Sequence, residues 1–273
     1  YSNNYKSPSF KNIAEWSESK DFKNPNLAII AVPPNYQKDV LRELFNICEP
    51  KMLLLEKPIA SNLKDLKIIK KIIRNINHTD IFINYIRCYL PAVKELKTII
   101  DSNKLGQFIH GNITYGKGLL NNASHFINLA ELLLGEFTFL NKGKITSKCL
   151  GYDNEINITL SALNFSNALL NVVSISKLGL VAGEIDLWFD HGRILWPNNG
   201  DHIFIWYAEK EKSIDGYLRL SNNPKTISTD MKSYQIHVLN FLNDFYNKQS
   251  IKNLSCSLNS GLKTLELLLN IQT

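Results

Sequence analysis

Two short stretches of the sequence carry side chains suited to chemistry, and the first is Glu56-Lys57-Pro58. These residues follow the apolar run KMLLL at 51–55, which reads as a buried strand. An ammonium group and a carboxylate would then stand together at the mouth of a sheet. The same residues are equally compatible with an ordinary exposed loop lysine. The position of Lys57 alone leaves both interpretations open.

The second stretch is GLLNNASHFINLAELLLG, residues 118–135, which contains His125. The small and amide side chains before His125 would hold the backbone close to a ligand, and an apolar helix is predicted for 125–134. Imidazole is the unperturbed side chain that exchanges a proton near neutral pH. A histidine hydrogen-bonded at a helix start is the structural alternative. The other five histidines have no partner pattern, and no metal-ligand motif, nucleophile elbow or phosphate loop is present.

The elements that must position Lys57 alternate between strands and helices. Strands are predicted at 27–32, 51–55 and 80–85, with helices at 37–47 and 61–75 between them. This spacing indicates a parallel sheet with crossover helices, an α/β fold that binds ligands beyond the carboxyl ends of its strands. At that edge the first strand ends in Ala31, Val32, Pro33 and Pro34. This stiff loop either holds a flat ligand or merely ends the strand.

After a helix predicted at 92–103, the spacing of the apolar residues changes to the alternation that is typical of strands. Strands are then predicted at 108–115, 138–149, 156–164, 168–176, 184–189, 193–196, 202–208 and 216–220, and helices at 230–247 and 260–271 close the chain. Turn residues between most of the strands indicate a large open sheet that is mostly antiparallel. We therefore predict two domains, residues 1–103 and an α+β domain at 104–273.

Composition excludes several classes of protein. The 273 residues are 44% hydrophobic and 21% charged, as in ordinary globular proteins, and no apolar run approaches the roughly 20 residues of a membrane helix. The net charge of +6 is dispersed, so nucleic acid is not an expected partner. The four cysteines are widely spaced, which predicts free thiols in a reducing cytoplasm.

Taken together, these stretches resemble the Gfo/Idh/MocA family of nicotinamide-dependent dehydrogenases, which includes glucose-fructose oxidoreductase and inositol dehydrogenase. The resemblance rests on the AVPP strand end, LLEKP at 54–58, NYIRCY at 84–89, Leu105-Gly106 and the stretch 118–135. It implies a Rossmann domain that binds NAD or NADP, followed by a substrate domain whose open sheet often forms an oligomer interface.

The resemblance also implies roles for single residues. Lys57 matches the lysine that polarises the substrate oxygen, and His125 matches the acid/base, with Asn121 at the position of a catalytic aspartate. The implied cofactor-binding residues are Ala31, Val32, Pro33, Pro34, Glu56, Lys57, Pro58 and Asn84. The implied substrate-binding residues are Arg87, Tyr115, Asn122 and Asn128, and no metal is implied.

The sequence departs from the family pattern in several places. Asn121 and Asn128 stand where aspartates are usual, which removes charge that would support a protonated histidine or lysine. Ala123 replaces a glycine. The Rossmann glycine fingerprint is absent, so we expect that about 30 residues are missing before Tyr1, by the usual βαβ length, and that the pyrophosphate loses its main anion site.

These observations predict a cytoplasmic NAD(P)-dependent oxidoreductase acting on a hydroxyl or carbonyl of a sugar, cyclitol or sugar nucleotide. One alternative is a catalytically impaired protein of the same fold that only binds a sugar or a partner. A second is an NAD-dependent glycosidase of the same family. The apolar strand residues, including five aromatics, predict a homo-oligomer formed through the open sheet, although the same side chains could pack on helices. The aromatics are Trp188, Phe189, Trp196, Phe204 and Trp206.

Overall fold

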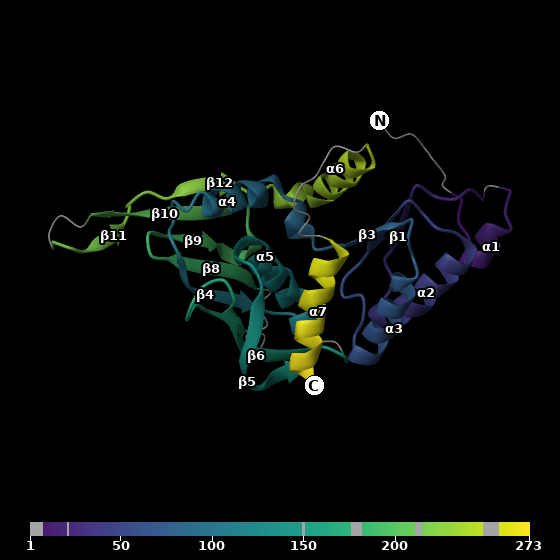
Figure 1. The fold of residues 1–273 in the computed structure, drawn as a ribbon, viewed down its shortest axis with the longest axis horizontal. Coiled ribbons are helices and arrows are strands. Elements are labelled where there is room, and N and C mark those ends of the chain that lie inside the picture. The colour runs from purple at the N-terminus through teal and green to yellow at the C-terminus, as the bar shows by residue number, and fades with distance from the viewer. Residues whose placement is uncertain (1–7, 21, 149–150, 176–181, 211–214, 248–256) are drawn as a thin grey trace.

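The chain is described from a computed structural model that covers residues 8–20, 22–148, 151–175, 182–210, 215–247 and 257–273 (Figure 1). A helical layer that contains α2 (Pro34–Ile47) and α3 (Leu63–Arg74) lies at one end of the molecule, and the hairpin that contains β11 (Leu218–Leu220) projects at the other. Helix α7 (Leu258–Gln272) runs between these two parts. Ser2 and Asn3 stand near the expected position of the cofactor-selecting residue and carry neither the acidic side chain that favours NAD nor an arginine that would favour NADP. Both lie outside the described ranges, as do Cys149 and Cys256.

The first sheet contains three parallel strands in the order β1 (Leu27–Ile30), β2 (Met52–Leu55) and β3 (Asp80–Ile83). Every residue of the central strand β2 is buried, because a strand between two neighbours and beneath helices has no wet face. The crossovers are α2 (Pro34–Ile47) and α3 (Leu63–Arg74). The predicted Rossmann-like arrangement is confirmed.

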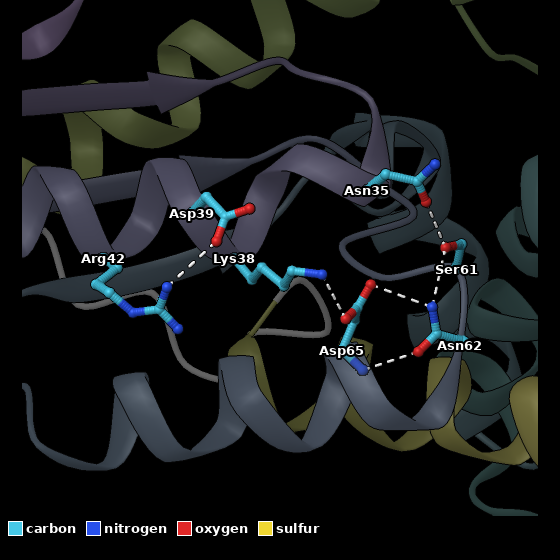
Figure 2. Close-up of polar contacts among 7 residues, drawn as sticks. All are labelled: Asn35, Lys38, Asp39, Arg42, Ser61, Asn62 and Asp65. Atoms are coloured by element: carbon cyan, nitrogen blue, oxygen red, sulfur yellow. Dashed lines mark hydrogen bonds and ion pairs between the residues drawn. The ribbon is translucent and has the colours of Figure 1, made fainter.

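The two crossover helices are joined at their first turns (Figure 2). Helix α3 begins at the Asn62 cap, whose side chain accepts the backbone N–H of Asp65 at 2.9 Å. Lys38 of α2 pairs with Asp65 at 2.7 Å, while the Ser61 hydroxyl donates to Asn35 at 2.7 Å. Helix α2 begins three residues before the predicted start, because a proline is well accommodated in a first helical turn. These contacts fix the loops that follow β1 and β2.

Two helical segments lead to the second sheet, namely η1 (Ile86–Tyr89) and α4 (Pro91–Asp101). Near the N-terminus lies a short helix that the sequence pattern did not predict, α1 (Ile13–Ser17). The strands of the second sheet are β4 (Phe108–Tyr115), β5 (Phe137–Lys148), β6 (Asn154–Ala162), β7 (Leu169–Ser174), β8 (Gly183–Phe189), β9 (Gly192–Trp196), β10 (His202–Lys210), β11 (Leu218–Leu220) and β12 (Lys225–Ser228).

The described strands form a nine-stranded sheet in the order β11-β10-β9-β8-β4-β7-β6-β5, with β12 pairing beside β10. All pairs are antiparallel except β4 with β7, which is parallel. The predicted large and mostly antiparallel sheet is confirmed. Strand β12 was not predicted, since its four residues are mostly exposed and give little apolar alternation.

The remaining helices include η2 (Leu119–Ala123), a π-helical turn that runs directly into α5 (Ser124–Leu134). The other helices are η4 (Pro197–Asn199), η5 (Met231–Ser233), α6 (Tyr234–Tyr246) and α7 (Leu258–Gln272). Most of α5 is buried. Helix α7 contacts α5 and also returns to β3, where Gly261 lies so close to Ile83 that a Cβ atom would stand 2.6 Å from its Cδ1. The domain boundary near residue 103 stays a prediction.

Two further sequence expectations concern the whole chain. Among the described helices, none combines the length and apolar character that crossing a lipid bilayer requires. Cys48 and Cys88 are buried thiols.

Candidate active site

Lys57 and Asn121 bring the two sequence stretches together, although 64 positions separate them. Lys57 lies just beyond the carboxyl end of β2, and Asn121 lies in the π-helical turn before α5. The Lys57 ammonium donates to the Asn121 backbone carbonyl and lies 3.4 Å from its side-chain oxygen. Burial, followed by the positive charge of Arg87, lowers the pKa of Lys57 to about 8, against the opposing effects of Glu56 and Asp153. The lysine is therefore a partly buried cation.

His125 is the second residue of α5 and is 8% exposed. Its ring meets that of Tyr85 edge to face, with the ring centroids 5.7 Å apart. Burial, followed by the positive charges of Lys57 and Arg87, lowers the pKa of His125 well below its ordinary value. Its Nδ1 atom is buried without a hydrogen-bond partner among the described residues. The imidazole is consequently neutral at neutral pH and has an unused nitrogen.

Arg87 lies in η1 and is 4% exposed. Its Nε donates to the Asn199 side chain at 3.0 Å, and its guanidinium lies 4.1 Å above the Phe126 ring. Burial lowers the pKa of Arg87 to about 9, which leaves it protonated at neutral pH. Arg87 thus adds a second positive charge close to His125.

Gln37, Glu56 and Asn84 form a polar cluster at the carboxyl edge of the parallel sheet. The Gln37 amide donates to the backbone carbonyls of Val32 at 3.3 Å and Glu56 at 2.7 Å, so it joins the loops after β1 and β2. The Asn84 amide donates to the Glu56 carboxylate at 2.6 Å. The side-chain oxygens of Gln37 and Asn84 remain buried without a partner in the described part of the chain. Gln37 was missed in the sequence because it belongs to no motif.

Two buried carboxylates at the start of β6, Asp153 and Glu155, hold the beginning of the helix that carries His125. Asp153 accepts the backbone N–H groups of Leu120 and Asn121, each at 2.9 Å. Glu155 accepts the N–H of Gly118 at 3.0 Å. Carboxylates are favoured at a helix N-terminus, where backbone N–H groups lack partners. Neither residue was predicted as part of the site.

Comparison with known proteins relates the N-terminal part of the chain to one family. The model of the Gfo/Idh/MocA oxidoreductase family, described as an NAD-binding Rossmann fold, matches residues 2–85. This part of the chain is similar to the Gfo/Idh/MocA family. No curated protein sequence gave a match.

Solved structures share the fold across both parts of this chain. A levoglucosan dehydrogenase in complex with NADH and levoglucosan is 15% identical, with a TM-score of 0.72, and the match covers 95% of this chain and 79% of that one. An NAD-binding oxidoreductase from Klebsiella pneumoniae is 12% identical, with a TM-score of 0.70 and coverage of 91% and 79%. A super-repressor mutant of Gal80p from Saccharomyces cerevisiae is 12% identical, with a TM-score of 0.70 and coverage of 90% and 77%.

The residues at the carboxyl edge of the parallel sheet offer polar groups that a bound dinucleotide could use. The unpartnered oxygens of Gln37 and Asn84 are acceptors suited to amide N–H or ribose O–H donors. Ala31 and Pro33 are exposed at the same edge, whereas Pro34 is buried and begins α2. Among the described residues no group of three or more His, Cys, Asp or Glu side chains is arranged to hold a metal ion.

Three of the expected substrate-binding residues have their polar groups engaged within the protein. The Tyr115 hydroxyl is fully buried and exchanges hydrogen bonds at 2.9 Å with both the N–H and the carbonyl of Ile156. The Asn122 amide donates to the Gly116 and Ala182 carbonyls. Their local contacts could not be read from the sequence, so Tyr115 and Asn122 looked available.

Asn128 is the third of these residues and is fully buried between helices. Its oxygen accepts from the Cys88 thiol at 3.2 Å, and its amide donates to Ser260 at 3.2 Å and Thr264 at 2.9 Å. Asn128 therefore joins η1, α5 and α7. The substrate-binding roles of Tyr115 and Asn128 stay predictions, and the polar atoms of both side chains have partners within the protein.

Proposed function

We propose that this chain is an NAD(P)-dependent dehydrogenase that acts on a hydroxyl or carbonyl group of a sugar, cyclitol or sugar nucleotide. The observation that carries the proposal is the convergence of a cation, Lys57, and a neutral histidine, His125, beyond the carboxyl edge of a Rossmann sheet. Ligands of such sheets bind at this edge.

The charges of the two residues suit alcohol oxidation. When a secondary alcohol is oxidised, the carbon loses a hydride and its oxygen loses a proton. His125 is held neutral by burial and by the positive charges of Lys57 and Arg87, so it is able to accept the proton. The Lys57 ammonium stabilises negative charge on the substrate oxygen. NAD(P)+, when bound, supplies the hydride acceptor.

The cofactor would be held by the polar cluster and the loops joined by it. Glu56 and Asn84 would orient the nicotinamide side, and the loop 31–34 would line the dinucleotide. The unpartnered Gln37 and Asn84 oxygens support this assignment, since buried acceptors are rarely left without a donor. Both NAD and NADP are proposed, because the part of the chain expected to select between them lies outside the described residues.

The proposed substrate class is supported by the small polyhydroxylated molecules bound in structures of the same fold. Levoglucosan, L-sorbose and L-tartaric acid occur in three of these structures. In this chain, Arg87 and the exposed side of Asn121 would face such a substrate. We also propose a cytoplasmic location, supported by the buried thiols Cys48 and Cys88.

A second candidate is a binding protein without turnover. Two observations favour it: an asparagine stands at position 121, and the Lys57 ammonium is already engaged by the Asn121 backbone carbonyl. The fold is shared with a protein described as a super-repressor mutant, so it is not restricted to structures described as oxidoreductases.

One experiment separates the two candidates. Binding of NADH and NADPH to the purified chain is measured by calorimetry, and nicotinamide reduction is then followed at 340 nm with levoglucosan, sorbose, inositols and sugar nucleotides. A dehydrogenase reduces the cofactor with at least one substrate, and Lys57→Met and His125→Gln each lower kcat/KM by about 100-fold or more. The matched control is Lys97→Met, which removes a partly exposed lysine that pairs with Asp101. Sugar binding without a signal at 340 nm would favour the binding protein.

We further propose that the chain forms a homo-oligomer through the open face of the nine-stranded sheet. The five aromatic residues singled out in the sequence divide between its two faces. Phe189 and Trp196 are buried in the core, whereas Trp188 is 37% exposed and Phe204 and Trp206 are partly exposed. A large sheet face with exposed aromatic rings supports burial against a second copy.

A further inference from the structure

Asp153 is a buried carboxylate that belongs to no motif of the sequence. It stands immediately before β6 and is 1% exposed. Its Oδ1 accepts the backbone N–H of Leu120 and the side-chain amide of Gln272, and its Oδ2 accepts the N–H of Asn121, all at 2.9 Å. Every one of these donors is uncharged. A buried negative charge held only by neutral donors is costly to maintain unless a positive charge lies near.

Asn121 connects Asp153 to such a charge. Asp153 binds the N–H of Asn121, while the carbonyl and side-chain oxygens of the same residue face the Lys57 ammonium. Asn121 is thus held from one side by a carboxylate and from the other by a cation. The N–H and the carbonyl belong to adjacent peptide groups, so Asp153 acts on Lys57 by holding Asn121 in place and, through space, by its charge.

We propose that Asp153 is a positioning residue for Lys57: acting through Asn121, it fixes the ammonium at the mouth of the parallel sheet and supplies its buried counter-charge. A carboxylate on the neighbouring sheet thereby compensates for the uncharged side chain at position 121. This inference rests on the proposed function only where it assumes that Lys57 takes part in the reaction. The interaction between the charges of Asp153 and Lys57 exists in the folded chain whether or not the protein is an enzyme.

Besides Asp153, the charged groups that act on Lys57 are Glu56 and Arg87. Glu56 and Asp153 favour the ammonium, Arg87 from η1 disfavours it, and His125 from α5 is neutral. Glu56 is adjacent in sequence and is engaged by Asn84. Asp153 is therefore the acidic group that reaches Lys57 from the second sheet.

A purely structural cap is the competing interpretation, and Glu155 provides the matched control. Glu155 is also 1% exposed, and it accepts the N–H of Gly118 at 3.0 Å and the hydroxyls of Ser147 and Ser174 at 2.9 Å. It caps the same helix start without contacting Asn121. Glu155→Gln is expected to loosen the helix start as Asp153→Asn does, while leaving Lys57 with its counter-charge.

The test is the pH dependence of acetylation of Lys57. Trace acetic anhydride is added to the full chain between pH 6 and 10, and the modified Lys57 peptide is quantified by mass spectrometry. In the wild-type chain the midpoint is expected near 8. In Asp153→Asn the midpoint should move to lower pH, so that the unprotonated fraction at pH 7 rises about threefold or more. In Glu155→Gln the plateau rate can change, but the midpoint should not.

Equal midpoints in the wild type and Asp153→Asn, or equal shifts in both variants, would overturn the proposal. If Asp153→Asn does not fold, the reciprocal measurement replaces it. Removing the cation by Lys57→Met should raise the pKa of the Asp153 carboxyl, followed by NMR on 13C-labelled aspartate, because the coupling between two sites is mutual. An unchanged Asp153 titration would count against the link. Neither readout requires turnover, so the proposal and the dehydrogenase assignment can fail separately.

Discussion

At the scale of single residues, the charges around His125 decide whether it acts as a base. Burial lowers its pKa most, and the neighbouring cations Lys57 and Arg87 lower it further. The unfolded chain takes up a proton at this histidine near its ordinary pKa of about 6.5. The folded state therefore gains stability from His125 above that pH and loses it as the pH falls toward the lower folded pKa.

Lys57→Met removes one of these cations without adding bulk. The pKa of His125 should rise toward its ordinary value, since burial remains but part of the repulsion is lost. Histidine ring NMR measures the titration, and the resonance is assigned by its loss in His125→Gln. Lys38→Met, a control on α2 whose lysine pairs with Asp65, should leave the His125 titration unchanged. A His125 pKa that is the same with and without Lys57 would contradict the proposed coupling.

Glu131 gives a second residue-scale prediction. Burial raises its pKa to about 7, while a hydrogen bond from Thr264 opposes the shift and Glu136 adds to it. Because the folded pKa lies above the unfolded one, the protonated form stabilises the fold below about pH 4.5, and this contribution is lost as the pH rises through 7. Glu131→Gln should therefore raise the free energy of unfolding at pH 8.5 by about 2 kcal/mol and change it little at pH 4.5.

Thermal unfolding of Glu131→Gln at the two pH values measures the difference. The control is Glu136→Gln, which replaces an exposed carboxylate that pairs with Lys263 nearby. Its effect should be within about 0.5 kcal/mol at both pH values. A lower Tm for Glu131→Gln at pH 8.5 would show that the charged form of Glu131 stabilises the fold.

The sequence alone could identify site residues that lie next to the end of a predicted strand or the start of a predicted helix. It could not identify residues that reach the site only through contacts between distant parts of the chain. Lys57 follows a strand and His125 starts a helix, so both could be singled out from local pattern. Asp153 is a single acidic residue before a strand, and only tertiary structure brings it to the helix start. For Asn128 the local sequence could not show that its amide has partners on another helix, namely Ser260 and Thr264 of α7.

At the scale of elements, the turn before α5 depends on Gly118. This residue has a φ of +94°, and a Cβ atom there would stand 2.0 Å from the Asp153 carboxylate. Gly118→Ala therefore combines backbone strain with a clash against a buried charge. We expect a loss of about 3 kcal/mol in the free energy of unfolding, measured by urea denaturation.

Gly216→Ala is the matched control for this loss. Gly216 also has a positive φ, +80°, but no atom lies within 4 Å of its added Cβ. Its cost should be limited to the backbone preference, about 1 kcal/mol. Equal losses for the two variants would mean that contact with Asp153 contributes nothing.

Strands and helices with a regular spacing of apolar residues could be predicted from the sequence. The strands that pair with one another could not be predicted as well. Strand β7 alternates as a sheet strand should, but nothing local reveals that it pairs with β4 in the parallel direction. That pairing depends on the chain connections between the two strands. The π-helical turn η2 could not be predicted either, because its residues have no periodic apolar pattern. The turn is held by the carboxylates of Glu155 in β6 and of Asp153, the residue before β6.

At the scale of the whole molecule, α7 connects the two sheets. Its Lys70–Glu266 ion pair to α3 is 2.7 Å long, Gly261 packs on Ile83 of β3, and Thr264 bonds to Asn128 of α5. The C-terminal helix therefore contributes to both sides of the candidate site. Relative movement of the two parts would have to break these contacts.

The open face of the nine-stranded sheet carries the partly exposed aromatic residues Trp188, Phe204 and Trp206. Arg193 lies between Trp188 and Trp206, at 4.6 and 5.4 Å from their ring centroids, and forms two hydrogen bonds of 2.9 Å with Asp186. Such a surface of aromatic rings and a paired arginine is typical of an interface core, where Trp and Arg are enriched.

Trp206→Arg tests whether this face joins two copies of the chain. The substitution places a second positive charge beside Arg193 and removes a ring, so an interface that buries this position should lose its stability. In size-exclusion chromatography with light scattering, the wild type should elute as an oligomer and Trp206→Arg as a monomer at the same concentration. Tyr217→Arg, on an exposed side chain of the projecting hairpin, should leave the oligomer intact. A monomeric wild type at about 100 µM, or an oligomer that tolerates Trp206→Arg, would mean that the sheet face is not the interface, since oligomers of useful stability persist at micromolar concentrations.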